Sequence, residues 1–256
     1  MSLPVAVVTG ASSGLGHGLA LRLAEAGYGV GLLARRLDRL ESLVGRIEQA
    51  GGRALAVRCD VSRPEDVRSA LAACAATLGP VDLLVANAGV SGNTRITRPG
   101  LAEGVERVMA VNFLGAVYAV EAVLPSMLER DRGHIVAIGS LAGFRGLPLS
   151  AAYSASKAAM ANFFESLRID LHRTGVDVTL VRPGYVRTEM TDHNDHPMPF
   201  RLELDEGVDR VMRAIQVRRR SVAFPWPLAR LAWISQIFPD AVYDWVASSV
   251  DRRKTD

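Results

Sequence analysis

The sequence predicts a protein of the α/β class, in which a doubly wound parallel sheet is flanked by helices on both faces. Short, continuously apolar runs alternate with longer segments in which apolar residues recur at helical spacing. Strands that are covered on both faces read as unbroken apolar runs, whereas strands with a solvated face alternate. Glycine-rich or polar turns follow several of these runs, at the sheet edge where such folds bind ligands.

Taken in order along the chain, the patterns predict a series of strand–helix repeats. The first run is β-branched and ends in a glycine-rich turn, and Pro64 stands at a position that favours a helix start. Strands are expected at 5–8, 30–34, 54–59, 83–85, 134–139 and 176–181, and helices at 15–26, 39–49, 64–78, 103–130 and 151–174. The run at 176–181 is the last clear strand. No linker or tandem repeat interrupts the pattern, so residues 1–256 are expected to form one domain.

Composition excludes several classes of protein. Hydrophobic residues make up 49% and charged residues 22% of the chain, which is ordinary for a globular protein. The net charge of +3 is modest, and its clearest cluster, Arg218–Arg220, lies in no recognition motif, so we expect no nucleic-acid partner. Cys59 and Cys74 form neither a disulfide framework nor a metal-ligand set. With no basic leader or cleavage site at the N-terminus, this cysteine usage predicts a cytoplasmic protein.

The first predicted strand ends in a loop suited to a dinucleotide. Glycines at three positions allow a tight turn and a close approach of the backbone to a pyrophosphate. The helix that follows directs its free N–H groups and positive dipole end at the phosphates. The loop lacks the Gly-Lys-Ser/Thr of a P-loop, which disfavours ATP. The residues expected to contact the cofactor here are Gly10, Ser12, Ser13, Gly14, Leu15 and Gly16.

The end of the second strand indicates which dinucleotide binds. Proteins that prefer NAD usually place a carboxylate there for the ribose 2′-hydroxyl, but this chain has Ala34. Arg35 and Arg36 follow, and a guanidinium at this place can bind a 2′-phosphate in a bidentate manner. The sequence therefore predicts NADP(H), with the alternative that Arg35, Arg36 and Arg39 form only the solvated start of a helix.

Tyr153 and Lys157 stand four residues apart and share one face of a predicted helix. A phenol with a pKa of ~10 is a poor base near neutrality. A positive charge ~4 Å away, at an effective dielectric of ~20, is worth about 4 kcal/mol and would lower that pKa by about three units. We therefore expect Tyr153 to serve as a general acid–base. Ser140, at the end of a predicted strand, can donate a hydrogen bond to a substrate oxygen.

Together these motifs resemble the short-chain dehydrogenase/reductase family, whose members have a Rossmann-like fold. The resemblance rests on T-G-x-x-x-G-x-G at 9–16, N-A-G at 87–89, Y-x-x-x-K at 153–157 and P-G at 183–184. It runs from about Leu3 to about Thr191. It implies an NADP(H)-dependent oxidoreductase that transfers a hydride between nicotinamide and a carbonyl or alcohol. A second basic residue often precedes the middle glycine of the family's loop, and Ser13 stands there instead.

The resemblance also implies roles for residues outside the phosphate loop. Its catalytic tetrad would be Asn112, Ser140, Tyr153 and Lys157, with the Asn112 backbone holding a water on a proton relay. Tyr153 and Lys157 would also contact the cofactor, and Lys157 would reach the nicotinamide ribose. The remaining cofactor contacts would be Asp60, Val61, Asn87, Ala88, Gly89, Pro183, Gly184, Val186 and Thr188. The alternative, purely structural interpretation of Asp60 is a helix cap. That of Asn112 is a polar residue that is hydrogen-bonded locally within its helix.

Residues 191–256 are expected to form a substrate loop and an apolar C-terminal segment of the same domain. His193 and His196 have no visible third ligand, so no metal site is predicted. The loop at 192–200 is expected to be mobile and to exclude water on closing. All three tryptophans, Trp226, Trp233 and Trp245, lie in the apolar segment. This segment suits core or substrate-pocket packing first, then an oligomer surface, then peripheral contact with lipid. An apolar segment beside the pocket favours a hydrophobic substrate.

Two other function classes compete with the oxidoreductase. A non-catalytic NADP-binding sensor or scaffold would need the loop and Arg35 but not the tetrad, because fold alone does not fix function. A serine hydrolase would need G-x-S-x-G, and in the run 139–143 the serine comes one place too early. The helical run at 228–238 would span only ~17 Å, too short for a hydrocarbon core of ~30 Å, so no transmembrane segment is expected. The resemblance implies a homodimer or homotetramer packed through 103–130 and 151–174.

Overall fold

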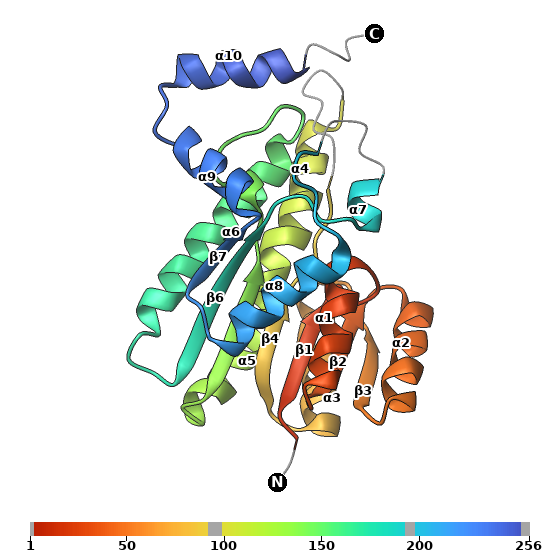
Figure 1. Ribbon diagram of the computed structural model, residues 1–256. Helices are drawn as coiled ribbons and strands as arrows, with labels where there is room; N and C mark the ends of the chain where they lie inside the picture. The colour runs from red at the N-terminus through yellow and green to blue at the C-terminus, as the bar shows by residue number, and fades with distance from the viewer. Residues whose placement is uncertain (1–2, 92–98, 193–197, 252–256) are drawn as a thin grey trace.

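The computed structural model, which describes residues 3–91, 99–192 and 198–251, is built around a parallel sheet of seven strands between two layers of helices (Figure 1). The strand order is β3-β2-β1-β4-β5-β6-β7, and every pair of neighbours is parallel. The chain builds outward from β1 to β3, then returns and builds outward from β4 to β7. The switch point therefore lies between β1 and β4. The strands are β1 Val5–Thr9, β2 Gly29–Ala34, β3 Arg53–Arg58, β4 Val81–Ala86, β5 Gly133–Ile138, β6 Val176–Pro183 and β7 Ser221–Phe224.

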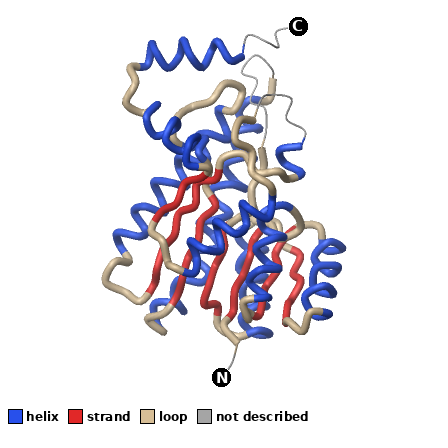
Figure 2. The backbone as a smooth tube through the Cα atoms, viewed as in Figure 1, coloured by secondary structure: helices blue, strands red, loops and turns tan. Residues whose placement is uncertain are grey.

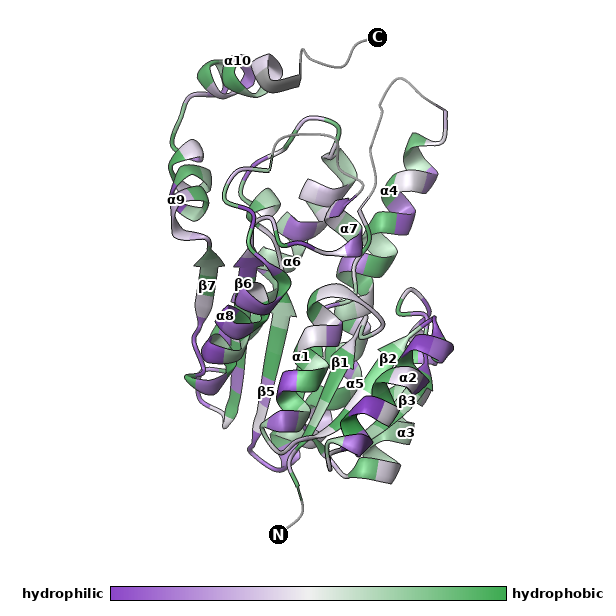
Figure 3. Cartoon of the chain, turned by 45° about the vertical axis from the view of Figure 1, so that its right-hand side comes forward, coloured by the Kyte–Doolittle hydropathy of each residue, from purple (hydrophilic) through white to green (hydrophobic). Residues whose placement is uncertain are grey.

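Helices cover both faces of this sheet, as Figure 2 shows. Residues from α1, α2 and α8 pack in one apolar cluster with strand residues, and residues from α3, α5 and α6 pack in the other. The central strands are apolar and buried along their length, as Figure 3 shows in its hydrophobic colour. The helices are α1 Gly14–Glu25, α2 Leu37–Gln49, α3 Pro64–Leu78, α4 Leu101–Met109, α5 Gly115–Glu129, α6 Ala151–Asp170, α7 Glu189–Asp192, α8 Leu204–Gln216, α9 Trp226–Ser235 and α10 Asp240–Asp251.

One long helical region, 101–129, contains a π-turn. Residues Ala110–Leu114 join α4 to α5 with π-helical hydrogen bonding in place of α-helical bonding. Such turns widen a helix locally and are frequent at functional sites. By length and composition this region is the single described helix that is apolar enough to cross a membrane, with a mean hydropathy of 1.7. Its buried face belongs to the apolar cluster beneath the sheet, which accounts for that composition.

The C-terminal third adds elements that the sequence pattern did not predict. β7 pairs with β6 and completes the sheet, so the strand at 176–181 is not the last. α8 begins with a capping box in which Glu203 and Glu206 each accept a bond from the other's backbone. Its buried residues recur at helical spacing and end at Ile215.

The three tryptophans are exposed, which corrects the expectation that they pack in the core or the substrate pocket. Trp226, Trp233 and Trp245 are 68%, 60% and 71% exposed. α9 is attached at its start, where Leu228 packs close to Gly184. α10 lies beyond α9 and away from the sheet in Figures 1 and 3. The three indole rings of the apolar segment therefore lie on the surface of the protein.

A single arginine ties this segment to the loop that follows β5. The Arg145 guanidinium donates to the carbonyl oxygen of Ser235, the last residue of α9, at 2.8 Å, and to that of Phe238, just beyond it, at 3.0 Å. It also pairs with Asp240 at 2.6 Å and lies 4.0 Å from the centre of the Tyr243 ring. Cations at a helix C-terminus stabilise the unpaired carbonyls there. Arg145 therefore holds both C-terminal helices against the loop.

Candidate functional site

The glycine loop between β1 and α1 is shaped for close approach of a ligand. Gly10 has φ +68°, and a Cβ there would lie 2.8 Å from the Cα of Ala88. A Cβ on Gly16 would lie 2.4 Å from the carbonyl oxygen of Gly10. The side chain of Ser13 does not cap α1, so the first N–H groups of that helix keep their capacity to bind an anion. The loop therefore fits the pyrophosphate of a dinucleotide.

Thr9 and Asn87 hold the ends of β1 and β4 together at the switch point. The Thr9 hydroxyl accepts hydrogen bonds from the backbone N–H groups of Asn87 and Ala88, each at 3.0 Å. The Asn87 amide donates in return to the carbonyl oxygens of Thr9, at 2.9 Å, and Gly10, at 3.3 Å. This reciprocal set fixes the mouth of the cleft. Asn87 therefore shapes the backbone at this edge of the cleft.

Arg36 is hydrogen-bonded to the glycine loop. Its guanidinium donates to the hydroxyls of Ser13, at 2.7 Å, and Ser12, at 3.0 and 3.2 Å. Arg35 also lines the cleft, and its charge acts on Asp60. Burial raises the pKa of Asp60, but hydrogen bonds from the Ser62 hydroxyl and backbone, together with the charges of Arg35 and Arg63, hold that pKa below its usual value. Asp60 makes no cap to α3, whose N-cap residue is Arg63.

Ser140, Tyr153 and Lys157 line one cleft, at the carboxyl end of β5 and the first turns of α6. The hydroxyls of Ser140 and Tyr153 share a hydrogen bond. The Lys157 ammonium donates to the carbonyl oxygen of Ile138 at 2.9 Å and is 3% exposed. Burial lowers the pKa of Lys157 to about 8. No described carboxylate forms an ion pair with it.

The pKa of Tyr153 moves in the direction opposite to the one expected. Burial raises it, and the hydrogen bond with Ser140 lowers it only in part. The Lys157 nitrogen lies 5.9 Å from the centre of the Tyr153 ring, and burial is the largest influence on the pKa of this phenol. Desolvation therefore prevails, and the phenol is held in its neutral, proton-donating form.

Asn112 lies in the π-turn and is fully buried. Its side-chain oxygen accepts from the backbone N–H of Val90 at 2.7 Å. Its amide donates to the carbonyl oxygen of Val90 and to the Ser156 hydroxyl, both at 3.0 Å. Ser156 stands next to Lys157 on α6. Asn112 therefore connects the chain after β4 with the helix that carries Tyr153 and Lys157, and its side chain does not line the cleft.

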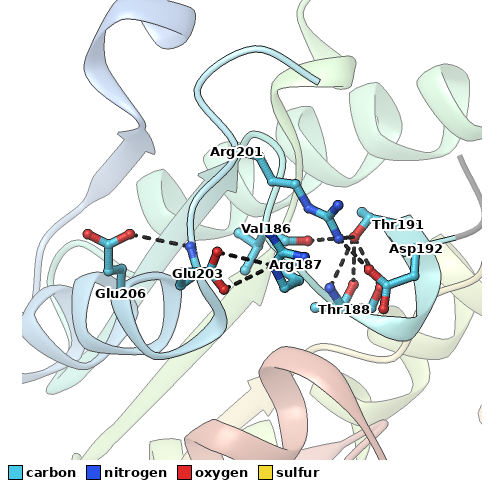
Figure 4. A network of polar contacts seen from close by, with 8 residues as sticks. All are labelled: Val186, Arg187, Thr188, Thr191, Asp192, Arg201, Glu203 and Glu206. Atoms are coloured by element: carbon cyan, nitrogen blue, oxygen red, sulfur yellow. Dashed lines mark hydrogen bonds and ion pairs between the residues drawn. The ribbon is translucent and has the colours of Figure 1, made fainter. Parts of the chain in front are cut away.

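The end of β6 and the chain after it bring the last predicted residues to the cleft. Pro183 and Gly184 line it, and Gly184 donates its N–H to the carbonyl oxygen of Phe224 at 2.7 Å. Thr188 lies against the glycine loop, where a Cβ on Gly14 would come within 3.2 Å of its methyl group. The Thr191 hydroxyl ties the following turn together by donating to the carbonyl oxygen of Val186 at 2.7 Å (Figure 4).

The cleft gathers nearly all the predicted residues. Gly16 and Asn112 are the predicted residues that do not line it, because one sits behind the loop and the other is buried in the π-turn. His193 and His196, at which the sequence predicts no metal site, lie outside the described residues. Within the described ranges, no group of three or more histidine, cysteine or carboxylate side chains is placed to hold a metal ion. Lining residues that the sequence did not indicate are Cys59, Val90, Val111, Ile138, Gly139, Glu189, Met190 and Thr191.

Comparison with known proteins agrees with this geometry. A sequence profile described as short chain dehydrogenase matches residues 4–198. An oxidoreductase of Myxococcus xanthus is 44% identical over 247 residues, which cover 96% of this chain and 97% of the relative. The chain is also similar to a solved short chain dehydrogenase/reductase of Burkholderia phymatum in complex with NAD. That similarity has a TM-score of 0.79 at 28% identity and covers 87% of this chain and 89% of that one.

A second solved structure has nearly the same similarity. It is an alcohol dehydrogenase of the archaeon Thermococcus sibiricus complexed with 5-hydroxy-NADP, with a TM-score of 0.78 at 29% identity. The alignment covers 86% of this chain and 95% of that one. The profile spans most of the chain, and the relative from Myxococcus xanthus extends the match through the C-terminal segment. The chain therefore belongs to the short-chain dehydrogenase/reductase family and is an oxidoreductase.

Proposed function

We propose that the protein is an NADP(H)-dependent reductase or dehydrogenase that interconverts a carbonyl and an alcohol. The observation that carries this proposal is the placement of Ser140, Tyr153 and Lys157 in the same cleft as the glycine loop. A cofactor seated on that loop would supply or accept the hydride. None of these observations favours the alternative of a non-catalytic sensor, which needs no tetrad.

The side chains divide the proton chemistry among them. The buried, neutral Tyr153 hydroxyl donates a proton to the carbonyl oxygen during reduction and takes it back in the reverse direction. Ser140 orients that hydroxyl through their shared hydrogen bond and offers a polar group to the same substrate oxygen. Lys157 places a positive charge beside Tyr153 that favours the phenolate left after proton donation.

Asn112 is proposed as a positioning residue for this group. Its side chain uses its oxygen and its amide on Val90 and Ser156, so it acts through the backbone and through α6. The π-turn that contains it departs from the regular helical hydrogen bonding, which suits a backbone site for a relay water.

Two observations support a preference for NADP(H). β2 ends in Ala34, so no carboxylate of that strand end repels a 2′-phosphate. Arg36 and two serine hydroxyls converge on the rim of the same cleft. Of the two solved relatives described above, one is in complex with NAD and the other with 5-hydroxy-NADP. The choice is therefore proposed from this chain's own residues.

A hydrophobic substrate is supported by the cleft rather than by the tryptophans. Val90, Val111, Ile138 and Met190 line the cleft that contains Tyr153. Apolar walls around a few polar groups are usual for sites that take apolar small molecules. We expect the rate to rise with the alkyl chain length of an aldehyde series, and a preference for small sugars would contradict this.

We also propose that the protein is cytoplasmic and forms a homodimer or homotetramer, through α4–α5 and α6. Leu114 and Leu128 on the first of these, and Ile169 on the second, are exposed apolar residues. Light scattering coupled to gel filtration would give the oligomeric state, and Leu128→Glu should lower it if this surface is the contact. A monomer at micromolar concentration would contradict the assignment.

The decisive experiment compares wild type with Tyr153→Phe. Fluorescence titration should give the same affinity for NADPH in both proteins, because the ring that packs in the cleft is retained. NADPH consumption with a panel of aldehydes and ketones should fall at least ~100-fold in the variant, since proton transfer by a positioned group contributes about 10²–10⁴-fold. Equal binding with no turnover in either protein would favour the sensor, and no binding in either would overturn the proposal.

A further inference from the structure

Glu189 is a cleft residue to which the reaction described above gives no role. It is the first residue of α7, and it faces the start of α2 across the rim of the cleft. Its two carboxylate oxygens contact two different arginines. Oε2 lies 3.0 Å from the Arg36 guanidinium, and Oε1 contacts that of Arg39.

Arg36 thereby has three polar or anionic neighbours at once. One edge of its guanidinium is bound to the Ser12 and Ser13 hydroxyls of the glycine loop, and its Nη1 atom is paired with Glu189. The Glu189 carboxylate is therefore an anion held between the guanidinium groups of Arg36 and Arg39, beside the hydroxyls of Ser12 and Ser13. A phosphate monoester makes the same demands, because it presents several charged oxygens to forked donors.

The position of Glu189 does not depend on the arginines alone. α7 is closed by its own contacts, in which the Thr191 hydroxyl bridges Val186 and Thr188 and Asp192 pairs with Arg201 (Figure 4). The hydrogen bonds from Arg39 and Arg36 hold the pKa of Glu189 below its usual value. The carboxylate is therefore ionised at neutral pH and is held where the anion site lies.

We propose that Glu189 is a specificity-determining residue whose carboxylate competes with the 2′-phosphate of NADP(H) for Arg36 and Arg39. This inference rests on the proposed preference for NADP(H). Binding of a 2′-phosphate requires the carboxylate to leave the two guanidinium groups, and with it the contact between α7 and α2. NAD(H), which has no 2′-phosphate, leaves that contact in place. Glu189 thus sets how far the protein favours the phosphorylated cofactor.

The test measures binding of two nucleotides that differ only by the disputed phosphate. Adenosine 2′,5′-bisphosphate and AMP are titrated by calorimetry into wild type, Glu189→Gln and Asp192→Asn. Glutamine keeps the size of Glu189 while it removes the charge and replaces one of the two acceptor oxygens by a donor. Asp192→Asn is the matched control, because it removes a charge from the same helix without touching Arg36 or Arg39.

Glu189→Gln should bind the bisphosphate about three- to tenfold more tightly than wild type, as expected for removal of two exposed ion pairs. AMP affinity should stay within about twofold of wild type, and Asp192→Asn should leave both affinities within that range. An unchanged or weaker affinity of Glu189→Gln for the bisphosphate overturns the inference. The inference is also overturned if Glu189→Gln gains as much affinity for AMP as for the bisphosphate, or if Asp192→Asn gains the same affinity for the bisphosphate. Either result would reflect the change in net charge alone.

Fluorescence titration of wild type with NADPH and NADH, carried out beside these measurements, separates this inference from the proposed function. If wild type prefers NADPH to NADH and Glu189→Gln shows no gain, the cofactor assignment stands and the role of Glu189 is overturned. If wild type binds neither the bisphosphate nor NADPH, both are overturned. A double variant supplies an internal check, because replacing Arg36 and Arg39 with alanine removes the groups over which Glu189 competes and should abolish its effect.

Discussion

Replacing Lys157 with methionine should make the protein more stable while it removes activity. Lys157 is buried, pairs with no described carboxylate, and gives its one strong hydrogen bond to the carbonyl oxygen of Ile138. Burial disfavours its charged form and lowers its pKa to about 8. The positive charge that the reaction requires at Lys157 therefore lowers the stability of the folded protein. Methionine has a similar length and no charge to desolvate.

The size of the effect follows from the pKa. Lowering the pKa from 10.5 to about 8 means that keeping the proton at pH 7 costs the folded state about 3 kcal/mol, at ~1.36 kcal/mol for each pKa unit. The variant loses the hydrogen bond to Ile138, which is worth about 1–2 kcal/mol. The net expectation is a gain of about 1–2 kcal/mol in the free energy of unfolding. For a chain of this size that raises Tm by about 2–8 °C.

The sign of the pH dependence gives a sharper test. The folded pKa of Lys157 lies below the unfolded one, so between about pH 8 and pH 10.5 the unfolded chain binds more protons. The contribution of this residue to stability therefore rises with pH through that window. Burial raises the pKa of Cys59 to about 11 and that of Cys74 to about 12, which lowers stability at alkaline pH. Both thiols are common to the two proteins, so they cancel in the comparison.

Urea unfolding of wild type and Lys157→Met at pH 7 and pH 9.5 would measure this difference. The variant should be the more stable protein at pH 7, and its advantage should shrink at pH 9.5. The sequence contains two lysines, Lys157 and Lys254, so carbon NMR of lysine-labelled protein should resolve the Lys157 Cε titration directly. A variant destabilised by more than about 1 kcal/mol, or a Lys157 signal that does not titrate near pH 8, would refute the reasoning.

Three further substitutions test other parts of the structure. Arg36→Ala should weaken NADPH binding about 10- to 100-fold and NADH binding by less than about threefold, measured by fluorescence titration; equal losses would contradict its role at the 2′-phosphate. Gly10→Ala should lower the free energy of unfolding and the affinity for NADPH by about 1–3 kcal/mol each, because φ is +68° and the new Cβ would lie 2.8 Å from the Cα of Ala88; unchanged values would argue against the tight loop. Burial lowers the pKa of His134 to about 4, so stability should fall as pH drops from ~6.5 towards 4. His134→Gln should flatten that fall in urea titrations, and an unchanged slope would show that other groups cause it.

The class of fold was predictable because its strongest signal is local. Each central strand is apolar along its length, and each helix shows its own periodicity, so the first six strands and their order of appearance follow from the pattern. β7 was not predicted because it has four residues, Ser221–Phe224, which are too few to show a pattern. Its pairing with β6 defines it as a strand, and that pairing is visible only in the structure. α8 could have been predicted, because its capping box at Glu203 and Glu206 and the helical spacing of its apolar residues are both visible in the sequence.

The residues that line the cleft were largely predictable as a set, but their mutual contacts were not. Arg35 and Arg36 are adjacent in the sequence, and only the backbone at the start of α2 decides that Arg36 turns towards Ser12 and Ser13. The contact of Glu189 with Arg36 joins residues 153 positions apart, for which the sequence holds no local signal. The π-turn around Asn112 likewise has no spacing that distinguishes it from an α-helix. The raised pKa of Tyr153 depends on burial, which a motif does not reveal.

The guanidinium of Arg145 has a practical consequence for anyone who attaches something to this chain. β1 begins at one end of the sheet, whereas α10 lies beyond the opposite end, where the strands have their carboxyl ends (Figure 1). Arg145 and Tyr243 fasten α9 and α10 to the loop that begins at Ser140. A purification tag, a fluorophore or a surface linker placed after α10 would therefore pull on the backbone that positions Ser140. The same attachment ahead of β1 would leave that backbone undisturbed, so it is the end of the chain to immobilise or label.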